Sequence, residues 1–261
     1  MSRLGEVFEE CRAQSRAALI GYLPAGFPTV EGSKDVLRTM VSSGCDVVEV
    51  GLPFSDPVMD GPTIQRAAET ALRGGFRVRD LFGVVESVAS AGGRAVVMTY
   101  WNPVLAYGVD RFARDLAAAG GLGVITPDLV PDEGAEWIAA TEAHDLDRIF
   151  LVAPSSSAER IRMAARSSRG FLYATSVMGV TGARDVVSSA APALVKRVRE
   201  HTDMPVGVGL GVRNGAQAAE LAAVADGVIV GSAFVSAVED DGVAALTEEL
   251  ARGVRQVAAP A

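Results

Sequence analysis

The 261-residue sequence is poor in the residue types on which many catalytic sites depend. It contains two cysteines, two histidines and only two lysines, Lys34 and Lys196. Cys11 and Cys45 fit no metal-binding or redox spacing, so we expect free thiols in a reducing cytoplasm. The charged N-terminus lacks the apolar core of a signal peptide, and no stretch approaches the roughly 18 apolar residues of a transmembrane helix. These absences predict a cytoplasmic protein without a membrane span.

The overall charge narrows the class of partner. A formal net charge of −8 and a pI near 4.9 argue against nucleic acid or an anionic membrane as the main partner. A small anionic substrate is still compatible, because it needs only local hydrogen-bond donors. No linker or shift in composition interrupts the chain, so we expect residues 1–261 to form a single domain.

Short apolar runs alternate with helical patterns along the chain. Eight such runs, each followed by a predicted helix, lie at residues 17–23, 46–51, 94–100, 122–127, 148–152, 170–175, 205–210 and 226–230. This alternation over about 250 residues predicts an α/β fold, a (β/α)8 TIM barrel. An extra N-terminal helix at 2–15 and an inserted helix at 78–91, after the second strand, complete the pattern. A doubly wound open sheet is the alternative.

A carboxylate interrupts the second predicted strand. Glu49 stands in the run Val47–Gly51, where a charge costs several kcal/mol unless it is offset. Because strand side chains alternate, Glu49 faces the barrel interior near its mouth if Val48 and Val50 face the helices. Desolvation there raises a carboxyl pKa and makes the group usable as an acid and a base. Asp60, at the end of the following loop, is the second candidate, and a mispatterned surface strand is the alternative.

The scarcity of lysine and histidine removes competing mechanisms. A Schiff-base aldolase needs a lysine at a strand end, and both lysines fall in predicted helices. A metal-dependent aldolase typically needs histidines at the active face, but His144 and His201 precede the fifth and seventh strands and so lie at the opposite face. Proton transfer by carboxylates is the chemistry that this inventory favours.

Two glycine clusters follow the last two predicted strands, where barrels often bind phosphate. Gly209-Leu210-Gly211 ends the seventh strand and Gly231-Ser232 ends the eighth. Glycines let the backbone approach a phosphate, and a helix start supplies N–H donors. Ordinary strand-to-helix turns are the alternative. The loop at 176–188, after the sixth strand, is predicted to be a lid, with a flexible surface connection as its alternative.

The stretch from Glu49 through Asp60 to Gln65 closely resembles the signature of the tryptophan synthase alpha subunit family. Further agreement comes from Pro24-Ala25-Gly26-Phe27-Pro28, Pro127-Asp128-Leu129, Gly179-Val180-Thr181-Gly182 and Gly209-Leu210-Gly211. The resemblance implies retro-aldol cleavage of indole-3-glycerol phosphate to indole and glyceraldehyde 3-phosphate. Glu49 would protonate the indole ring carbon and remove a hydroxyl proton, and Asp60 would accept a hydrogen bond from the indole N–H.

The resemblance also implies further site residues and a partner. Substrate contacts would come from Tyr22, Tyr100, Tyr173 and Thr181, and phosphate contacts from Gly182, Gly211, Gly231 and Ser232. A beta subunit that holds pyridoxal phosphate would receive the indole in an alpha2beta2 heterotetramer, while this chain would bind no cofactor. The loop 53–60 and the lid would communicate between the subunits, with Asp56 a loop or interface residue.

The sequence departs from the form typical of this family at two places. Thr126 and Val130-Pro131 alter the residue order around Pro127-Asp128-Leu129, and Val177-Met178 make the lid more apolar. Neither departure touches Glu49 or Asp60. The alternatives are a stand-alone indole-releasing lyase, a weakly active regulatory subunit, or another phosphosugar barrel enzyme such as an isomerase.

Overall fold

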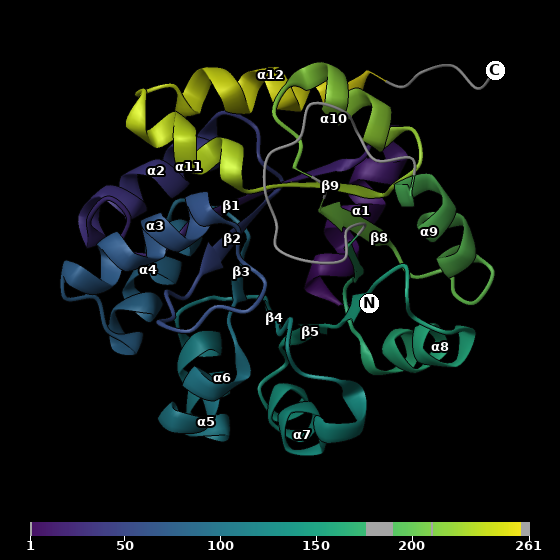
Figure 1. The fold of residues 1–261 in the computed structure, drawn as a ribbon, viewed down its shortest axis with the longest axis horizontal. Coiled ribbons are helices and arrows are strands. Elements are labelled where there is room, and N and C mark those ends of the chain that lie inside the picture. The colour runs from purple at the N-terminus through teal and green to yellow at the C-terminus, as the bar shows by residue number, and fades with distance from the viewer. Residues whose placement is uncertain (1, 176–189, 210, 257–261) are drawn as a thin grey trace.

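Parallel strands form a nearly closed barrel that helices surround (Figure 1). This computed structural model describes residues 2–175, 190–209 and 211–256. The described strands are β1 Ala18–Pro24, β2 Val47–Gly51, β3 Ala95–Met98, β4 Gly123–Ile125, β5 Asp147–Ile149, β6 Leu151–Val152, β7 Leu172–Thr175, β8 Val206–Gly209 and β9 Gly227–Val230. Their order in the sheet is β5-β4-β3-β2-β1-β9-β8-β7-β6, and every pair is parallel.

Strands β5 and β6 together occupy the fifth position of the barrel. β5 pairs with β4 and β6 pairs with β7, so Phe150 alone separates the two ends of the sheet along the chain. The Phe150 N–H donates to Ser168 Oγ at 3.2 Å instead of to a neighbouring strand, which divides the strand expected at 148–152. The eight-position barrel is confirmed, and the open doubly wound alternative is wrong.

The helices follow the strands largely as predicted. They are α1 Arg3–Ala13, α2 Val30–Ser42, α3 Pro62–Arg73, α4 Val78–Ser90, α5 Trp101–Tyr107, α6 Val109–Ala118, the 3-10 turn η1 Pro131–Glu133, α7 Ala135–Ala143, α8 Ala158–Ser167, α9 Ala190–Arg199, α10 Gly215–Ala222, α11 Ser232–Glu239 and α12 Val243–Arg255. The N-terminal helix α1 and the inserted helix α4 are confirmed. Helix α5 was not predicted. Pro103 lies in the first turn, where its missing N–H has no intrahelical partner to lose.

Helix α1 closes the N-terminal end of the barrel. Its apolar side chains join the inward side chains of the strands in one cluster: Leu4, Val7, Phe8, Cys11, Ala18, Ile20, Val47, Val96, Leu122, Ile125, Ile149, Phe171 and Ile229. The Leu4 N–H donates to the buried Asp147 carboxylate at 3.1 Å, which fixes the start of α1 against the start of β5. The C-terminal ends of the strands are thereby the end at which a site can form.

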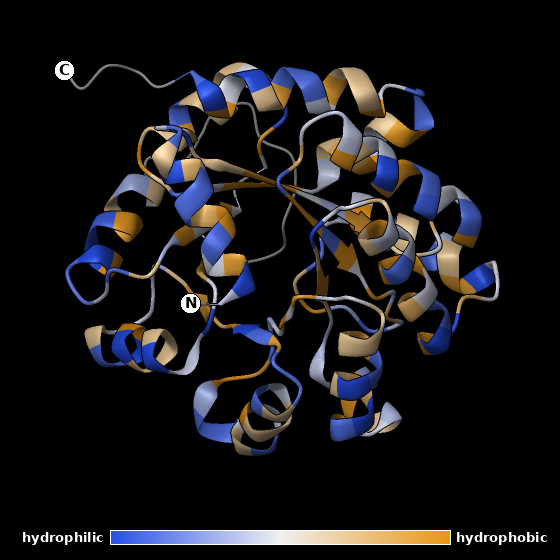
Figure 2. Cartoon of the chain, turned by 180° about the vertical axis from the view of Figure 1, so that it is seen from behind, coloured by the Kyte–Doolittle hydropathy of each residue, from blue (hydrophilic) through white to orange (hydrophobic). Residues whose placement is uncertain are grey.

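The outward faces of the strands pack against the helices. Figure 2 shows hydrophobic residues concentrated along the strands, while the helices mix hydrophobic and hydrophilic residues. In α6 the buried residues are Val109, Phe112, Ala113 and Leu116, the helical spacing of an apolar stripe. Within the described ranges, no helix is long and apolar enough to cross a membrane.

Helices α10 and α12 cross at unusually close range. A Cβ placed on Gly253 of α12 would lie 3.0 Å from the Cα and the carbonyl carbon of Gly215 in α10. The Gly215 N–H also donates to Glu249 Oε1 of α12 at 2.8 Å. The first turn of α10, which follows the turn after β8, is therefore held by α12 through backbone contact.

We expect Gly253→Ala to lower the free energy of unfolding by roughly 1–3 kcal/mol, because the crowded atoms are backbone and cannot rotate away. Gly83→Ala in α4 is the matched control. A Cβ at Gly83 meets nothing within 4 Å, so alanine there should stabilise the protein by about 0.5–1 kcal/mol through helix propensity. Urea unfolding of both variants measures the difference, and equal stabilisation by both substitutions would contradict the close crossing.

Candidate active site

The Glu49 side chain lies inside the barrel. It is 0% exposed, and neither carboxyl oxygen has a hydrogen-bond partner among the described residues. The neighbours Val48 and Val50 belong to the outer cluster that faces the helices, so Glu49 points inward, as the alternation predicted. In the sheet it stands opposite Tyr22 of β1 and Val96 of β3.

Asp60 is held at the same end of the barrel by Tyr100. The Tyr100 hydroxyl is hydrogen bonded to the Asp60 carboxyl group and also accepts the Met59 N–H at 3.0 Å. The rings of Tyr100 and Phe54 lie with their centroids 5.3 Å apart. Through these contacts Tyr100, the N-cap residue of α5, fixes the loop between β2 and α3, and with it the half-buried Asp60.

Two tyrosines occupy space that glycines leave open at the strand ends. A Cβ at Gly51 would collide with the Tyr22 hydroxyl and ring, and a Cβ at Gly209 would collide with the Tyr173 hydroxyl. Gly51 ends β2 and Gly209 ends β8. Sequence reasoning treated Gly209 as part of a phosphate loop and gave Gly51 no role. An alternating strand that carries glycine at an inward position is the signal that could have identified both.

Burial raises the pKa values of the acidic and tyrosine side chains in this site. Desolvation, with a smaller contribution from the charge of Asp60, raises the pKa of Glu49 from its ordinary value of 4.5 to about 8. Desolvation also raises the pKa of Asp60, which the hydrogen bond from Tyr100 opposes. The pKa values of Tyr22 and Tyr173 rise through burial and through the nearby charges of Asp60 and Glu49. At neutral pH Glu49 therefore holds a proton, and both phenols remain donors.

The predicted phosphate residues flank two strand ends. Gly231 caps the N-terminus of α11, Ser232 begins that helix, and Gly211 adopts a φ of +67° in the turn after β8. A helix N-terminus presents N–H donors and the positive end of its dipole to an anion. Thr181, Gly182 and the lid predicted at 176–188 lie outside the described residues.

The remaining scarce residues lie away from this face. Lys34 is in α2 and Lys196 in α9, as predicted. His144 follows α7 and pairs with Asp110 at 2.8 Å, and His201 precedes β8. Across the described ranges, no group of three or more His, Cys, Asp or Glu side chains is arranged to hold a metal ion.

Comparison with known proteins decides the family. A family model described as tryptophan synthase alpha chain matches residues 8–259. The chain belongs to the tryptophan synthase alpha chain family. It is therefore a lyase that cleaves indole-3-glycerol phosphate, and the phosphosugar isomerase alternative is wrong.

Individual members of the tryptophan synthase alpha chain family match along nearly their whole length. The alpha chain of Nocardia farcinica is 68% identical over 256 residues, which cover 97% of this chain and 96% of that protein. That of Mycobacterium avium is 67% identical over 261 residues, covering 99% and 96%. A solved structure of Mycobacterium tuberculosis tryptophan synthase superposes with a TM-score of 0.94 at 66% identity, covering 97% of this chain and 98% of the other. The alpha subunit from Legionella pneumophila str. Paris, at 31% identity, gives a TM-score of 0.87 and covers 98% and 100%.

The raised pKa of Glu49 should make the stability of the fold depend on pH. An unfolded chain releases the Glu49 proton near pH 4.5, whereas the folded chain holds it to about pH 8, so this group lowers stability as the pH rises between these values. Glutamine cannot titrate. Glu49→Gln should therefore be roughly 3–5 kcal/mol more stable than the wild type at pH 9, and the difference should largely vanish at pH 5.

Denaturant unfolding at both pH values measures this effect. Glu86→Gln, at an exposed position of α4, is the matched control and should give the same small difference from the wild type at both pH values. A Glu49→Gln variant whose stability relative to the wild type does not change with pH would contradict the burial of this carboxyl group.

Proposed function

We propose that Glu49 and Asp60 catalyse the cleavage by carboxylate acid–base chemistry. The observation that carries this proposal is the buried Glu49 carboxyl group, which lacks a partner among the described residues and keeps its proton to about pH 8. An acid of that pKa can give and regain a proton near neutrality.

The proposed steps balance without another reactant. Glu49 donates its proton to the indole ring carbon that bears the glycerol chain, and the Asp60 carboxylate stabilises the positive charge at the ring N–H. The Glu49 carboxylate then removes the proton from the hydroxyl on the adjacent chain carbon. The bond between ring and chain breaks, its electron pair returns to the ring, and the products are indole and the aldehyde. Glu49 ends in its starting, protonated state.

The other predicted residues complete the proposed site. Tyr100 orients Asp60, and Tyr173 contributes a substrate-contacting ring and hydroxyl. We assign the phosphate group to the backbone donors around Gly182, Gly211, Gly231 and Ser232, and we assign Thr181 to a contact with the rest of the substrate. Residues 1–261 would act as one domain.

The acid roles are tested by measuring indole release from indole-3-glycerol phosphate. Glu49→Gln removes the proton donor and acceptor, and we expect kcat to fall by about 10²–10⁴-fold. Asp60→Asn removes the negative charge beside the ring nitrogen and should lower kcat by a similar or smaller factor. Asp56→Asn, in the same loop but exposed, should retain most of the activity. Substantial activity in Glu49→Gln would overturn the mechanism.

We further propose that this chain pairs with a tryptophan synthase beta subunit in an alpha2beta2 complex, with pyridoxal phosphate only in that partner. The most exposed large hydrophobic side chains among the described residues are Val58, Leu105 and Val130. They follow β2, β3 and β4, so all three lie towards the C-terminal end of the barrel. Exposed apolar groups that share one face are typical of an interface. This surface favours a complexed enzyme over a stand-alone lyase, and the pairing of Glu49 with Asp60 disfavours a purely regulatory subunit.

The three segments that carry Val58, Leu105 and Val130 are joined to one another. The Trp101 N–H donates to both carboxylate oxygens of Asp128, at 2.9 and 3.1 Å, and Tyr100 bonds to Met59 in the first loop. We propose a cytoplasmic location for the complex, which the free thiols Cys11 and Cys45 support.

Introducing a charge on this surface should weaken the complex. We expect Val58→Asp to raise the beta-subunit concentration that gives half-maximal stimulation of indole release by about 10–100-fold, because the carboxylate must be desolvated in the interface. Ala244→Asp, exposed on α12, adds the same charge elsewhere and should have no effect. Equal responses of the two variants would show that the partner does not bind at Val58.

A further inference from the structure

Helix α5 begins without a cap from its own N-cap residue. That residue is Tyr100, whose side chain forms no capping hydrogen bond. Serine, threonine, aspartate and asparagine are the usual residues at this position, because a side-chain oxygen there accepts one of the free N–H groups of the first turn. The Tyr100 hydroxyl is instead bonded to the Asp60 carboxyl group and to the Met59 N–H. An acceptor for the start of α5 therefore has to come from another part of the chain or from water.

Asp128 supplies this acceptor from the turn after the next strand. Trp101, the first residue of α5, donates its N–H to Asp128 Oδ1 at 2.9 Å and to Oδ2 at 3.1 Å. A carboxylate also interacts favourably with the positive end of a helix dipole. Asp128 belongs to the Pro127-Asp128-Leu129 motif, and the proposed acid–base steps give this residue no role. Its contact with α5 is therefore the observation that its function has to explain.

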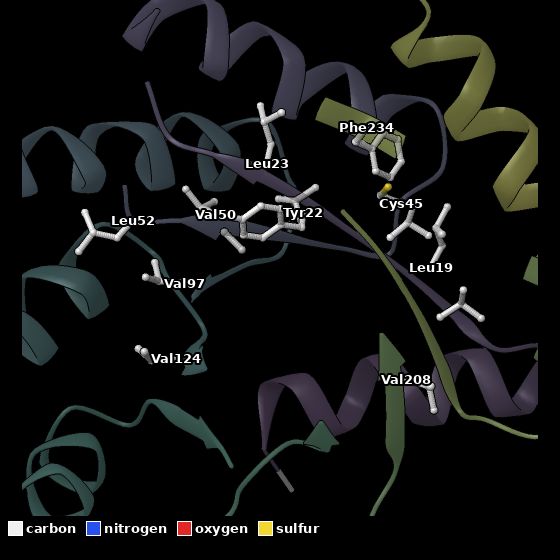
Figure 3. Close-up of a cluster of buried hydrophobic side chains, with 14 of the residues drawn as sticks. Leu19, Tyr22, Leu23, Cys45, Val50, Leu52, Val97, Val124, Val208 and Phe234 are labelled. Carbon is white, nitrogen blue, oxygen red and sulfur yellow. The ribbon is translucent and has the colours of Figure 1, made fainter. Parts of the chain in front are cut away.

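The two segments that meet at this contact leave adjacent strands. β3 leads to Tyr100 and β4 leads to Asp128, and Val97 of β3 pairs with Val124 of β4. Both valines are fully buried in the cluster that faces the helices (Figure 3). Beside Asp128, Leu129 is 5% exposed in the same cluster. The carboxylate is therefore carried by a well-packed segment, and its contact with the start of α5 fixes the backbone that carries Tyr100.

We propose that Asp128 is a positioning residue, which holds the start of α5 so that the Tyr100 hydroxyl stays bonded to the Asp60 carboxyl group. This inference rests on the proposed function, because it needs Asp60 to stabilise the positive charge on the indole ring. That charge develops in the transition state, so a displaced Asp60 lowers kcat more than it raises KM. Asp128 thus acts on the reaction through Tyr100, without touching the substrate.

The experiment measures indole release by the full chain with the beta subunit added to saturation, so that weaker pairing does not lower the rate. Asp128→Ala should lower kcat by about 3–10-fold, the size expected for a lost helix cap, and leave KM within about two-fold of the wild-type value. Asp128→Asn keeps an acceptor oxygen and should restore kcat to within about two-fold of wild type. In a Tyr100→Phe background, Asp128→Ala should change kcat by less than about two-fold, because the hydroxyl through which Asp128 acts is gone.

Asp132→Ala is the matched control. Asp132 lies in η1, between β4 and α7, and pairs with Arg160 of α8, so its loss should leave kcat unchanged. An unchanged kcat in Asp128→Ala, no rescue by Asp128→Asn, or an equal fall in the wild-type and Tyr100→Phe backgrounds would overturn the inference. Full activity in Asp60→Asn would instead overturn the proposed function. An enzyme that is sensitive to Asp60→Asn but not to Asp128→Ala overturns the assignment of Asp128 alone.

Discussion

The Glu49 carboxyl group, which has no hydrogen-bond partner among the described residues and is enclosed by a barrel of parallel strands, is the constraint on which the site depends. Burial raises the pKa of Glu49, so the strands that enclose this side chain determine the pH at which it loses its proton. Val48 and Val50 seal the outer side of the same strand against the helices, while α1 closes the far end of the barrel. The packing that stabilises the fold therefore also holds the proton that the chemistry uses.

Inward glycines give this enclosure its shape. Gly51 and Gly209 stand at the ends of β2 and β8, where a side chain would displace Tyr22 or Tyr173. Deeper in the barrel, the Phe171 ring likewise lies against a glycine, Gly207, which has no side chain to displace it. Aromatic rings from adjacent strands thus occupy volume that β8 and β2 give up.

Periodicity was enough to predict the barrel, because eight short and largely apolar runs each precede a helical pattern in the sequence. It also predicted the inward direction of Glu49, since Val48 and Val50 leave no other arrangement. Three features were not predicted from periodicity. Helix α5 has a proline in its first turn. The fifth strand divides where the Phe150 N–H donates to Ser168, and the Gly51–Tyr22 contact joins two strands. The divided strand and the Gly51–Tyr22 contact depend on residues distant in the chain. A proline is compatible both with the first turn of a helix and with a loop, so it did not identify α5.

The link between Asp60 and the exposed surface is the last consequence of this arrangement. Asp60 and Val58 are two residues apart in one loop, and Tyr100 bonds to both Met59 and Asp60 between them. Any displacement of Val58 by a partner must therefore either carry Asp60 with it or break a bond to Tyr100. Glu49, by contrast, sits in the middle of a strand that pairs on both sides. In the proposed complex, partner binding would therefore adjust the group that stabilises the ring charge while the proton donor stays fixed.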